Sequence, residues 1–113
     1  MSPRSARLAD PAQAAPVFAA LGDVTRLALM GRLSTRQPHS IAQLAEGLPV
    51  TRQAVTRHLE VLAHAGLVRD FRQGRERLWT PETKRHADAR LYLQTISKRW
   101  DEALARLKTF VET

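Results

Sequence analysis

The sequence predicts a mainly α-helical domain with one small β-hairpin, an α+β arrangement in which helices dominate. Three observations support this fold class. Short segments between residues 16 and 65 carry apolar residues at helical spacing, residues 67–80 alternate around a glycine turn, and residues 83–111 continue a helical pattern without a break. The chain has 113 residues and is most simply one domain.

The composition favours an anionic partner and limits the class of protein. There are 18 basic and 11 acidic residues, a net charge of +7, which suits nucleic acid or an acidic surface. The absence of cysteine excludes disulfides and thiolate metal sites and fits a reducing compartment. The longest apolar segment, residues 14–21, contains Pro16 and is far shorter than the ~20 residues of a membrane span. Because Asp10, Pro11 and Pro16 also interrupt any signal peptide, we expect a soluble cytoplasmic protein with no membrane partner.

Two short helices are predicted before residue 35. Pro16 suits the first turn of a helix, and Gly22 suits its end. Asp23 can then cap a second helix over about residues 24–34. We expect the second helix to bury four apolar residues and to expose its two arginines. The apolar residues are Val24, Leu27, Met30 and Leu33, and the arginines are Arg26 and Arg32.

The next segment predicts a helix-turn-helix. A loop at residues 35–39 precedes a third helix, where Ser40 and Gln43 have the spacing of a capping box. A turn at residues 47–50 leads into a helix at residues 51–65, for which Thr51 is a suitable cap. Short helices joined by a tight turn are typical of this motif. Pro49 stands where glycine is frequent, which leaves the geometry of the turn open.

The helix at residues 51–65 has two different faces. Val55, Leu59 and Leu62 follow the i, i+4, i+7 pattern and form its apolar side. Arginine and glutamine pair with guanine and adenine edges in the major groove, so the opposite side suits a recognition helix. The other interpretation is an ordinary solvated amphipathic helix. The polar residues near the helix start are Arg52, Gln53, Thr56 and Arg57.

A basic hairpin is predicted directly after this helix. Gly66 ends the helix, and strands at residues 67–72 and 76–80 flank a turn at residues 73–75. Such a hairpin is a wing, whose arginines would lie beside phosphates or in the minor groove. An ordinary hairpin with a basic edge is the alternative. Six arginines and three acidic residues between 52 and 77 favour the nucleic-acid interpretation. The wing arginines are Arg72, Arg75 and Arg77.

The last segment, residues 83–111, predicts one helix roughly 40 Å long. Its apolar residues alternate steps of three and four, the a/d pattern of a coiled coil. A helix this long cannot bury such a seam on so small a domain, so we expect a homodimer. The alternative is a helix folded back over its own domain. The seam is Leu93, Ile96, Trp100, Ala103, Leu107 and Phe110, widened by Tyr92, Leu104 and Val111.

This order of elements resembles the ArsR-type winged helix-turn-helix repressors of bacteria. The matching stretches are residues 18–26, 51–59 and 62–68, and the likeness covers about residues 14–112. The resemblance implies a dimer joined through its terminal helices, and repression by occupying an operator until an inducer relieves it. It also implies base contacts from Arg52, Gln53, Thr56 and Arg57, phosphate contacts from Ser40 and Thr51, and groove contacts from the wing arginines. The implied interface residues are Phe18, Leu93, Ile96, Trp100, Leu104 and Leu107.

The metal chemistry of this family does not carry over to the chain. Metal-sensing members hold two cysteines in the third helix, where Ser40 and Ala42 stand here. Another class uses an Asp and a His on the last helix, completed by a His and a Glu of the partner subunit. Asp88 and His86 imitate the first half, but the rest of that helix has no other histidine. The resemblance is therefore to the cysteine-free, metal-independent branch.

The remaining histidines and motifs indicate neither a catalytic site nor a cofactor. We expect His58 to be packed and hydrogen-bonded, His64 to lie on the surface and His39 to lie in a loop. No glycine-rich phosphate loop, nucleophile motif or paired carboxylates are present. The protein is predicted not to be an enzyme.

These observations predict a homodimeric transcriptional repressor that binds double-stranded DNA and is not regulated by metal. Residues 1–12 would form a flexible arm, residues 13–82 a winged helix-turn-helix domain, and residues 83–113 a dimerisation helix packed on that domain. Two alternatives stay open. One is a winged-helix module that binds proteins, and the other is a metal-responsive repressor with ligands other than cysteine.

Overall fold

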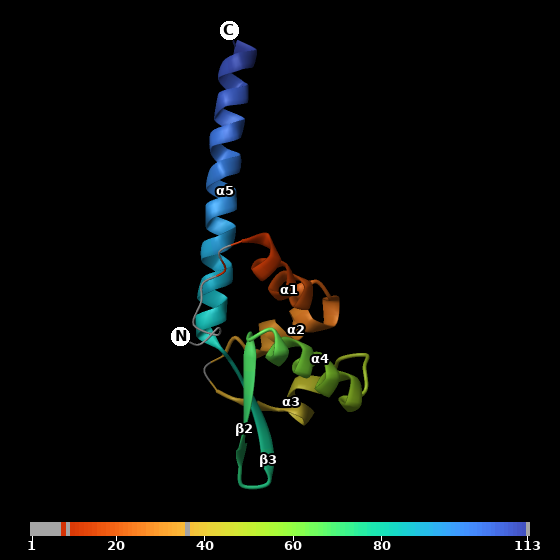
Figure 1. Ribbon diagram of the computed structural model, residues 1–113. Coiled ribbons are helices and arrows are strands. Elements are labelled where there is room, and N and C mark those ends of the chain that lie inside the picture. The colour runs from red at the N-terminus through yellow and green to blue at the C-terminus, as the bar shows by residue number, and fades with distance from the viewer. Residues whose placement is uncertain (1–7, 9, 36, 113) are drawn as a thin grey trace, which may run out of the picture.

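The computed structural model describes residues 8, 10–35 and 37–112. Figure 1 shows a body of short helices and a small sheet, from which the last helix extends as a single rod. This confirms the predicted mainly α fold class with a β-hairpin wing. The predicted arm at residues 1–12 lies mostly outside the described residues. The elements are α1 (Pro11–Leu21), α2 (Val24–Leu33), β1 (His39–Ser40), α3 (Ile41–Ala45), α4 (Arg52–His64), β2 (Val68–Gln73), β3 (Glu76–Pro81) and α5 (Thr83–Glu112).

Helix α1 begins earlier than predicted. Asp10 caps it by accepting from the Gln13 amide at 2.9 Å, and Pro11 occupies the first turn. Pro16 therefore lies inside the helix, on an exposed position, and the prediction that it begins the helix was wrong. Two prolines were available as a helix start, and only the first follows a capping side chain.

Helix α2 buries only part of the predicted apolar side. Leu33 is fully buried and Met30 is partly buried, as predicted, but Val24 is 83% and Leu27 is 56% exposed, and Leu29, which was not predicted, is fully buried. Arg26 and Arg32, predicted to be exposed, are partly buried. Their guanidinium groups donate to backbone carbonyls of α1 and of the end of α3, so both side chains lie against the body.

The helix-turn-helix forms as predicted. Ser40 and Gln43 make both hydrogen bonds of the capping box, at 3.2 and 2.9 Å. Gly47 in the turn has a φ of 77°, the left-handed conformation that a tight turn needs, so Pro49 does not have to supply it. Thr51 caps α4 by accepting from the Ala54 amide at 3.0 Å.

A Schellman motif ends α4 and directs the chain into the wing. The Leu67 amide donates to the Leu62 carbonyl and the Gly66 amide to the Ala63 carbonyl, both at 2.9 Å. Gly66 has a φ of 81°, as the motif requires. Leu62 and Leu67 are both fully buried, so the turn is anchored in the core.

The sheet has three antiparallel strands in the order β1-β3-β2. Strands β2 and β3 form the predicted hairpin, with Gln73 opposite Glu76 and Arg72 opposite Arg77. Strand β1 lies at the end of the predicted loop, and its two residues pair with Trp79 and Leu78. A strand this short has no periodicity to detect, and the pairing depends on a partner about forty residues away.

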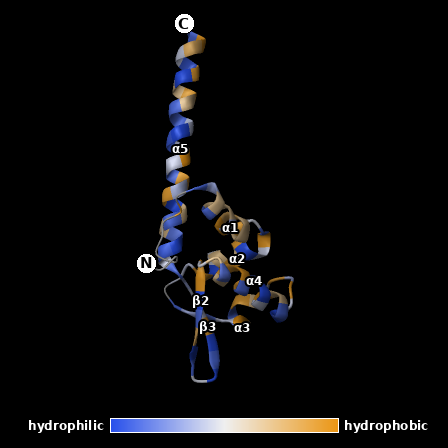
Figure 2. Ribbon diagram, viewed as in Figure 1, coloured by the Kyte–Doolittle hydropathy of each residue, from blue (hydrophilic) through white to orange (hydrophobic). Residues whose placement is uncertain are grey.

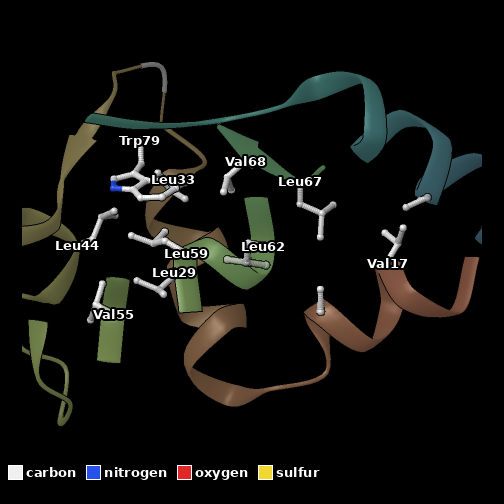
Figure 3. Packing of buried hydrophobic residues seen from close by; sticks show 12 residues of the cluster. Val17, Leu29, Leu33, Leu44, Val55, Leu59, Leu62, Leu67, Val68 and Trp79 are labelled. Atoms are coloured by element: carbon white, nitrogen blue, oxygen red, sulfur yellow. The ribbon is translucent and has the colours of Figure 1, made fainter. Parts of the chain in front are cut away.

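One core joins the helices to the sheet. Trp79 of β3 is fully buried and lies among leucines of α2, α3 and α4 (Figure 3). The apolar side of α4 faces this cluster, as predicted. The fully buried side chains are Leu29, Leu33, Leu44, Val55, Leu59, Leu62, Leu67 and Trp79.

Helix α5 packs on the body only at its beginning. The Tyr92 ring lies 6.0 Å from the ring of Phe18 in α1, and of residues 83–112 only Ala89 is buried. Beyond this contact the helix extends away from the body, and apolar residues recur along it up to its end (Figure 2). Trp100 is 63% and Phe110 is 79% exposed. The helix therefore does not fold back over its own domain.

Among the described residues, no single helix is long and apolar enough to cross a membrane. Helices α1 and α2 reach that length and hydropathy only together, and they are bent by 86° relative to each other.

Substitutions on the two sides of α4 should lower the free energy of unfolding by different amounts. Leu59→Ala removes a fully buried side chain and should lower the free energy of unfolding by about 2–5 kcal/mol. Val61→Ala, two residues away and 42% exposed, should change it by only about 0.5 kcal/mol. Urea denaturation at one fixed protein concentration measures both. Equal losses for the two variants would contradict the assigned orientation of α4.

Candidate nucleic-acid interface

The polar side of α4 is open at the start of the helix. Arg52, Gln53 and Arg57 are exposed, while Thr56 is partly buried. These side chains lie away from the buried residues Val55, Leu59 and Leu62 because a helix of 3.6 residues per turn separates the two sets. The predicted base-reading residues thus come together on the first two turns of one element.

The hydroxyl groups near this face differ in whether their protons are still available for hydrogen bonds to DNA. Thr51 and Ser40 use their oxygens to accept from helix amides, so each hydroxyl proton is available for a further acceptor such as a phosphate. Thr56 instead donates its proton to the Arg52 carbonyl at 3.0 Å. Toward a base, Thr56 can offer only its methyl group and an accepting oxygen.

The wing presents two of its three predicted arginines. Arg72 and Arg75 are exposed. The turn joining β2 and β3 consists of Gly74 and Arg75, and only Gly74 has a positive φ, at 64°, which fits a type II′ hairpin turn. This turn places Arg75 at the tip.

Arg77 makes a different set of contacts. Its Nε lies 2.6 Å from the Asp70 carboxylate on the facing strand, and its guanidinium lies 4.5 Å from the centre of the Trp79 ring. The side chain is therefore engaged within the hairpin, beside the residue that anchors the wing in the core. Sequence reasoning grouped Arg77 with the other wing arginines because a contact with Asp70 requires the strand register.

Glu60 belongs to the same outer face of α4 but was not predicted. It is exposed, and it follows Gln53 and Arg57 at i+7 and i+3. A carboxylate at such a position can accept from the amino group of cytosine. Helical spacing alone places Glu60 on this face, but the DNA contacts predicted from the sequence were basic, amide and hydroxyl side chains.

Histidine and acidic residues form no metal centre in the part of the chain that the structure describes. Across residues 8, 10–35 and 37–112, no three of them lie close enough to hold a metal ion. His58 is half-buried and contacts Arg26, as expected for a packed histidine, and His64 is exposed.

Comparisons with known proteins agree with this architecture. A family model described as a helix-turn-helix domain matches residues 21–70. YuzN of Bacillus subtilis, an uncharacterized HTH-type transcriptional regulator, is 40% identical over 68 residues, covering 55% of this chain and 74% of that protein. An ArsR-like transcriptional regulator from Rhodococcus sp. RHA1 is 37% identical with a TM-score of 0.72, covering 88% of this chain and 92% of that one.

A third similar structure, from Mycobacterium bovis, is described as a homodimeric winged helix-turn-helix DNA-binding domain and a possible ArsR-family regulator. It is 23% identical with a TM-score of 0.60 and covers 84% of each chain, a likeness that supports the fold alone. The relatives with higher identity are transcriptional regulators and not enzymes. This chain belongs to the ArsR family of DNA-binding helix-turn-helix transcriptional regulators.

Proposed function

We propose that the protein is a homodimeric repressor that binds an inverted-repeat operator through α4 and the wing, without regulation by metal. The observation that carries the proposal is the polar first half of α4, which is open to solvent and belongs to a helix that leads directly into a basic hairpin. An element of this shape and charge fits the major groove, with the wing beside the backbone.

The reading of bases would come from four side chains of α4. Arg52 and Arg57 suit guanine, Gln53 suits adenine, and the Thr56 methyl group suits the methyl of thymine. Ser40, Thr51, Arg72 and Arg75 would contact phosphates or the groove and set the register. We assign Arg77 to supporting the wing, because Asp70 and Trp79 already hold it.

The dimer is supported by the apolar side of α5. Leu93, Trp100, Leu104 and Leu107 are each about half exposed or more, and nothing in the described chain covers them. A continuous apolar face on a helix beyond the body favours a second copy of the chain. Of the other predicted interface residues, Ile96 is half-buried on α5, and Phe18 packs against Tyr92 of its own chain.

Independence from metal is supported by the chemistry of the third helix. Ser40 is engaged in a capping box, and Ala42 has no donor atom. The rival interpretation, a module that binds proteins, would be expected to expose apolar anchors on α4. The first turns of α4 expose arginine and glutamine instead.

The experiment that tests the proposal is selection of duplexes from a random library by the purified protein. We expect an enriched inverted repeat whose half-site centres lie about 10 bp or a small multiple apart. Placing that duplex over a promoter should lower reporter expression when the protein is present. Equal enrichment of all sequences would contradict specific binding, and raised expression would contradict repression.

The base-reading assignment makes its own prediction. Arg57→Ala and Gln53→Ala should each cost about 1–3 kcal/mol of binding to the selected duplex and relax the choice of base at one position. Fluorescence anisotropy over a series of salt concentrations measures this, and affinity should fall steeply with salt. If Arg57→Ala binds as tightly as the parent, the recognition helix has been wrongly assigned.

The two arginines of the wing should behave differently. Arg75→Ala should weaken binding to selected and scrambled duplexes alike and leave the free energy of unfolding unchanged. Arg77→Ala should lower the free energy of unfolding by about 1 kcal/mol, because it removes the contacts with Asp70 and Trp79. Anisotropy and urea denaturation of both variants separate the roles, and a reversed pattern would refute them.

The dimer is tested by two neighbouring residues of α5. Leu93→Glu places a charge in the apolar seam and should produce monomers, whereas Gln94→Glu, on an exposed position beside it, should leave the dimer intact. Analytical ultracentrifugation measures the state of each. A dimeric Leu93→Glu variant would locate the interface elsewhere.

A further inference from the structure

Arg26 connects α2 with the helices on either side of it. Its Nε donates to the Ala20 carbonyl at 2.5 Å, and its Nη2 lies 3.5 Å from the Ala19 carbonyl. Both carbonyls belong to the last turn of α1, where backbone oxygens carry partial negative charge, and the Ala19 carbonyl also accepts from the Gly22 amide at 3.1 Å. The third nitrogen, Nη1, lies 3.1 Å from Nδ1 of His58 on the recognition helix α4.

The contact with Arg26 involves one particular nitrogen of the His58 ring. An arginine keeps its charge and can only donate, so Nδ1 of His58 takes part in this hydrogen bond as the acceptor. An accepting Nδ1 fits the tautomer that carries its proton on Nε2. The same Nδ1 lies 3.9 Å from the Asp23 carboxylate, the nearest anion in the cluster.

Asp23 stays ionised beside this pair. Its carboxylate accepts from the Arg26 amide at 3.0 Å, and that hydrogen bond is the main reason why the pKa of Asp23 lies below its ordinary value. Burial opposes the shift, the positive charge of Arg26 adds to it, and a positive charge on His58 would add to it as well. Because its pKa is lowered, Asp23 keeps its charge throughout the range near neutral pH in which histidines titrate.

Protonation of His58 would change the hydrogen-bond partner of its Nδ1 from Arg26 to Asp23. A proton on Nδ1 would face the N–H of Arg26 at 3.1 Å and place two positive charges together, whereas Asp23 could accept that proton. We propose that Arg26 is a positioning residue that holds α4 against α1 and α2 through neutral His58, and that protonation of His58 releases this lock and weakens DNA binding.

The surroundings leave few other charges to compete with this exchange. Helix α1 has no ionisable side chain and contributes only its carbonyls. Helix α2 contributes Asp23 and Arg26. On α4 itself, the neighbouring Arg57 and Glu60 are exposed. The inference rests on the proposed operator binding for its effect on affinity, but the contact between Arg26 and His58 exists in the protein without DNA.

The decisive experiment compares affinity at different pH values in two matched variants. In His58→Gln the amide oxygen can still accept from Arg26 but does not titrate. His64→Gln is the control, since His64 is exposed on the same helix. Anisotropy with the selected duplex would be measured from pH 8 to pH 5.5, with thermal unfolding at each pH to verify that every variant is folded.

We expect the parent and His58→Gln to bind equally at pH 8, and the parent to bind between about twofold and tenfold more weakly at pH 5.5. His64→Gln should keep the loss seen in the parent relative to His58→Gln. Added positive charge alone predicts the opposite sign, a parent that binds more tightly at pH 5.5. Either that result, or the same pH dependence of affinity in the parent and in His58→Gln, would overturn the proposal.

A measurement without DNA separates this inference from the proposed function. Nitrogen chemical shifts of the His58 ring at pH 8 should show the proton on Nε2, and Arg26→Lys should weaken that preference. A proton on Nδ1 at pH 8 would overturn the lock whether or not an operator exists. If selection enriches no duplex, the operator proposal fails and the ring shifts still decide the contact.

Discussion

The fold depends on the burial of one side of α4 against α2 and the sheet. Leu59 and Leu62 meet Leu29 and Trp79 in a core that excludes water, which favours a single rotation of α4 about its axis. That rotation leaves Arg52, Gln53 and Arg57 facing solvent. The candidate recognition surface therefore follows from the packing, because a rotation of α4 about its axis would bury its arginines and expose its leucines.

Prediction from the sequence worked where local chemistry decides the structure. Capping by Ser40, Thr51 and Asp23, the end of α4 at Gly66 and the length of α5 all follow from nearby residues. It failed for part of the buried face of α2, where Val24 and Leu27 are exposed and the partly buried Arg26 and Arg32 donate to carbonyls outside the helix. Strand β1 was also not predicted, because His39 and Ser40 form a strand only by pairing with β3, which is distant in the sequence.

The candidate interface shows the same division. The polar face of α4 could be predicted because helical periodicity alone separates it from the core. Arg77 could not be told apart from Arg72 and Arg75, because all three lie in one basic hairpin. Only the register, which places Asp70 within reach of Arg77 and Trp79 beneath it, distinguishes a side chain that holds the wing from side chains that are free to bind.

Helix α1 lies between the long helix α5 and the side chain of Arg26, and it contacts both. Phe18 packs on Tyr92 of the long helix α5, and the carbonyls of the next two residues, Ala19 and Ala20, contact Arg26, which in turn contacts His58 of α4. The helix proposed to join two protomers and the helix proposed to read DNA are therefore connected through a few adjacent residues of α1. The contact of Phe18 with Tyr92 and the contacts of Ala19 and Ala20 with Arg26 therefore come from adjacent residues of α1, which places the support of α4 next to the packing of α5.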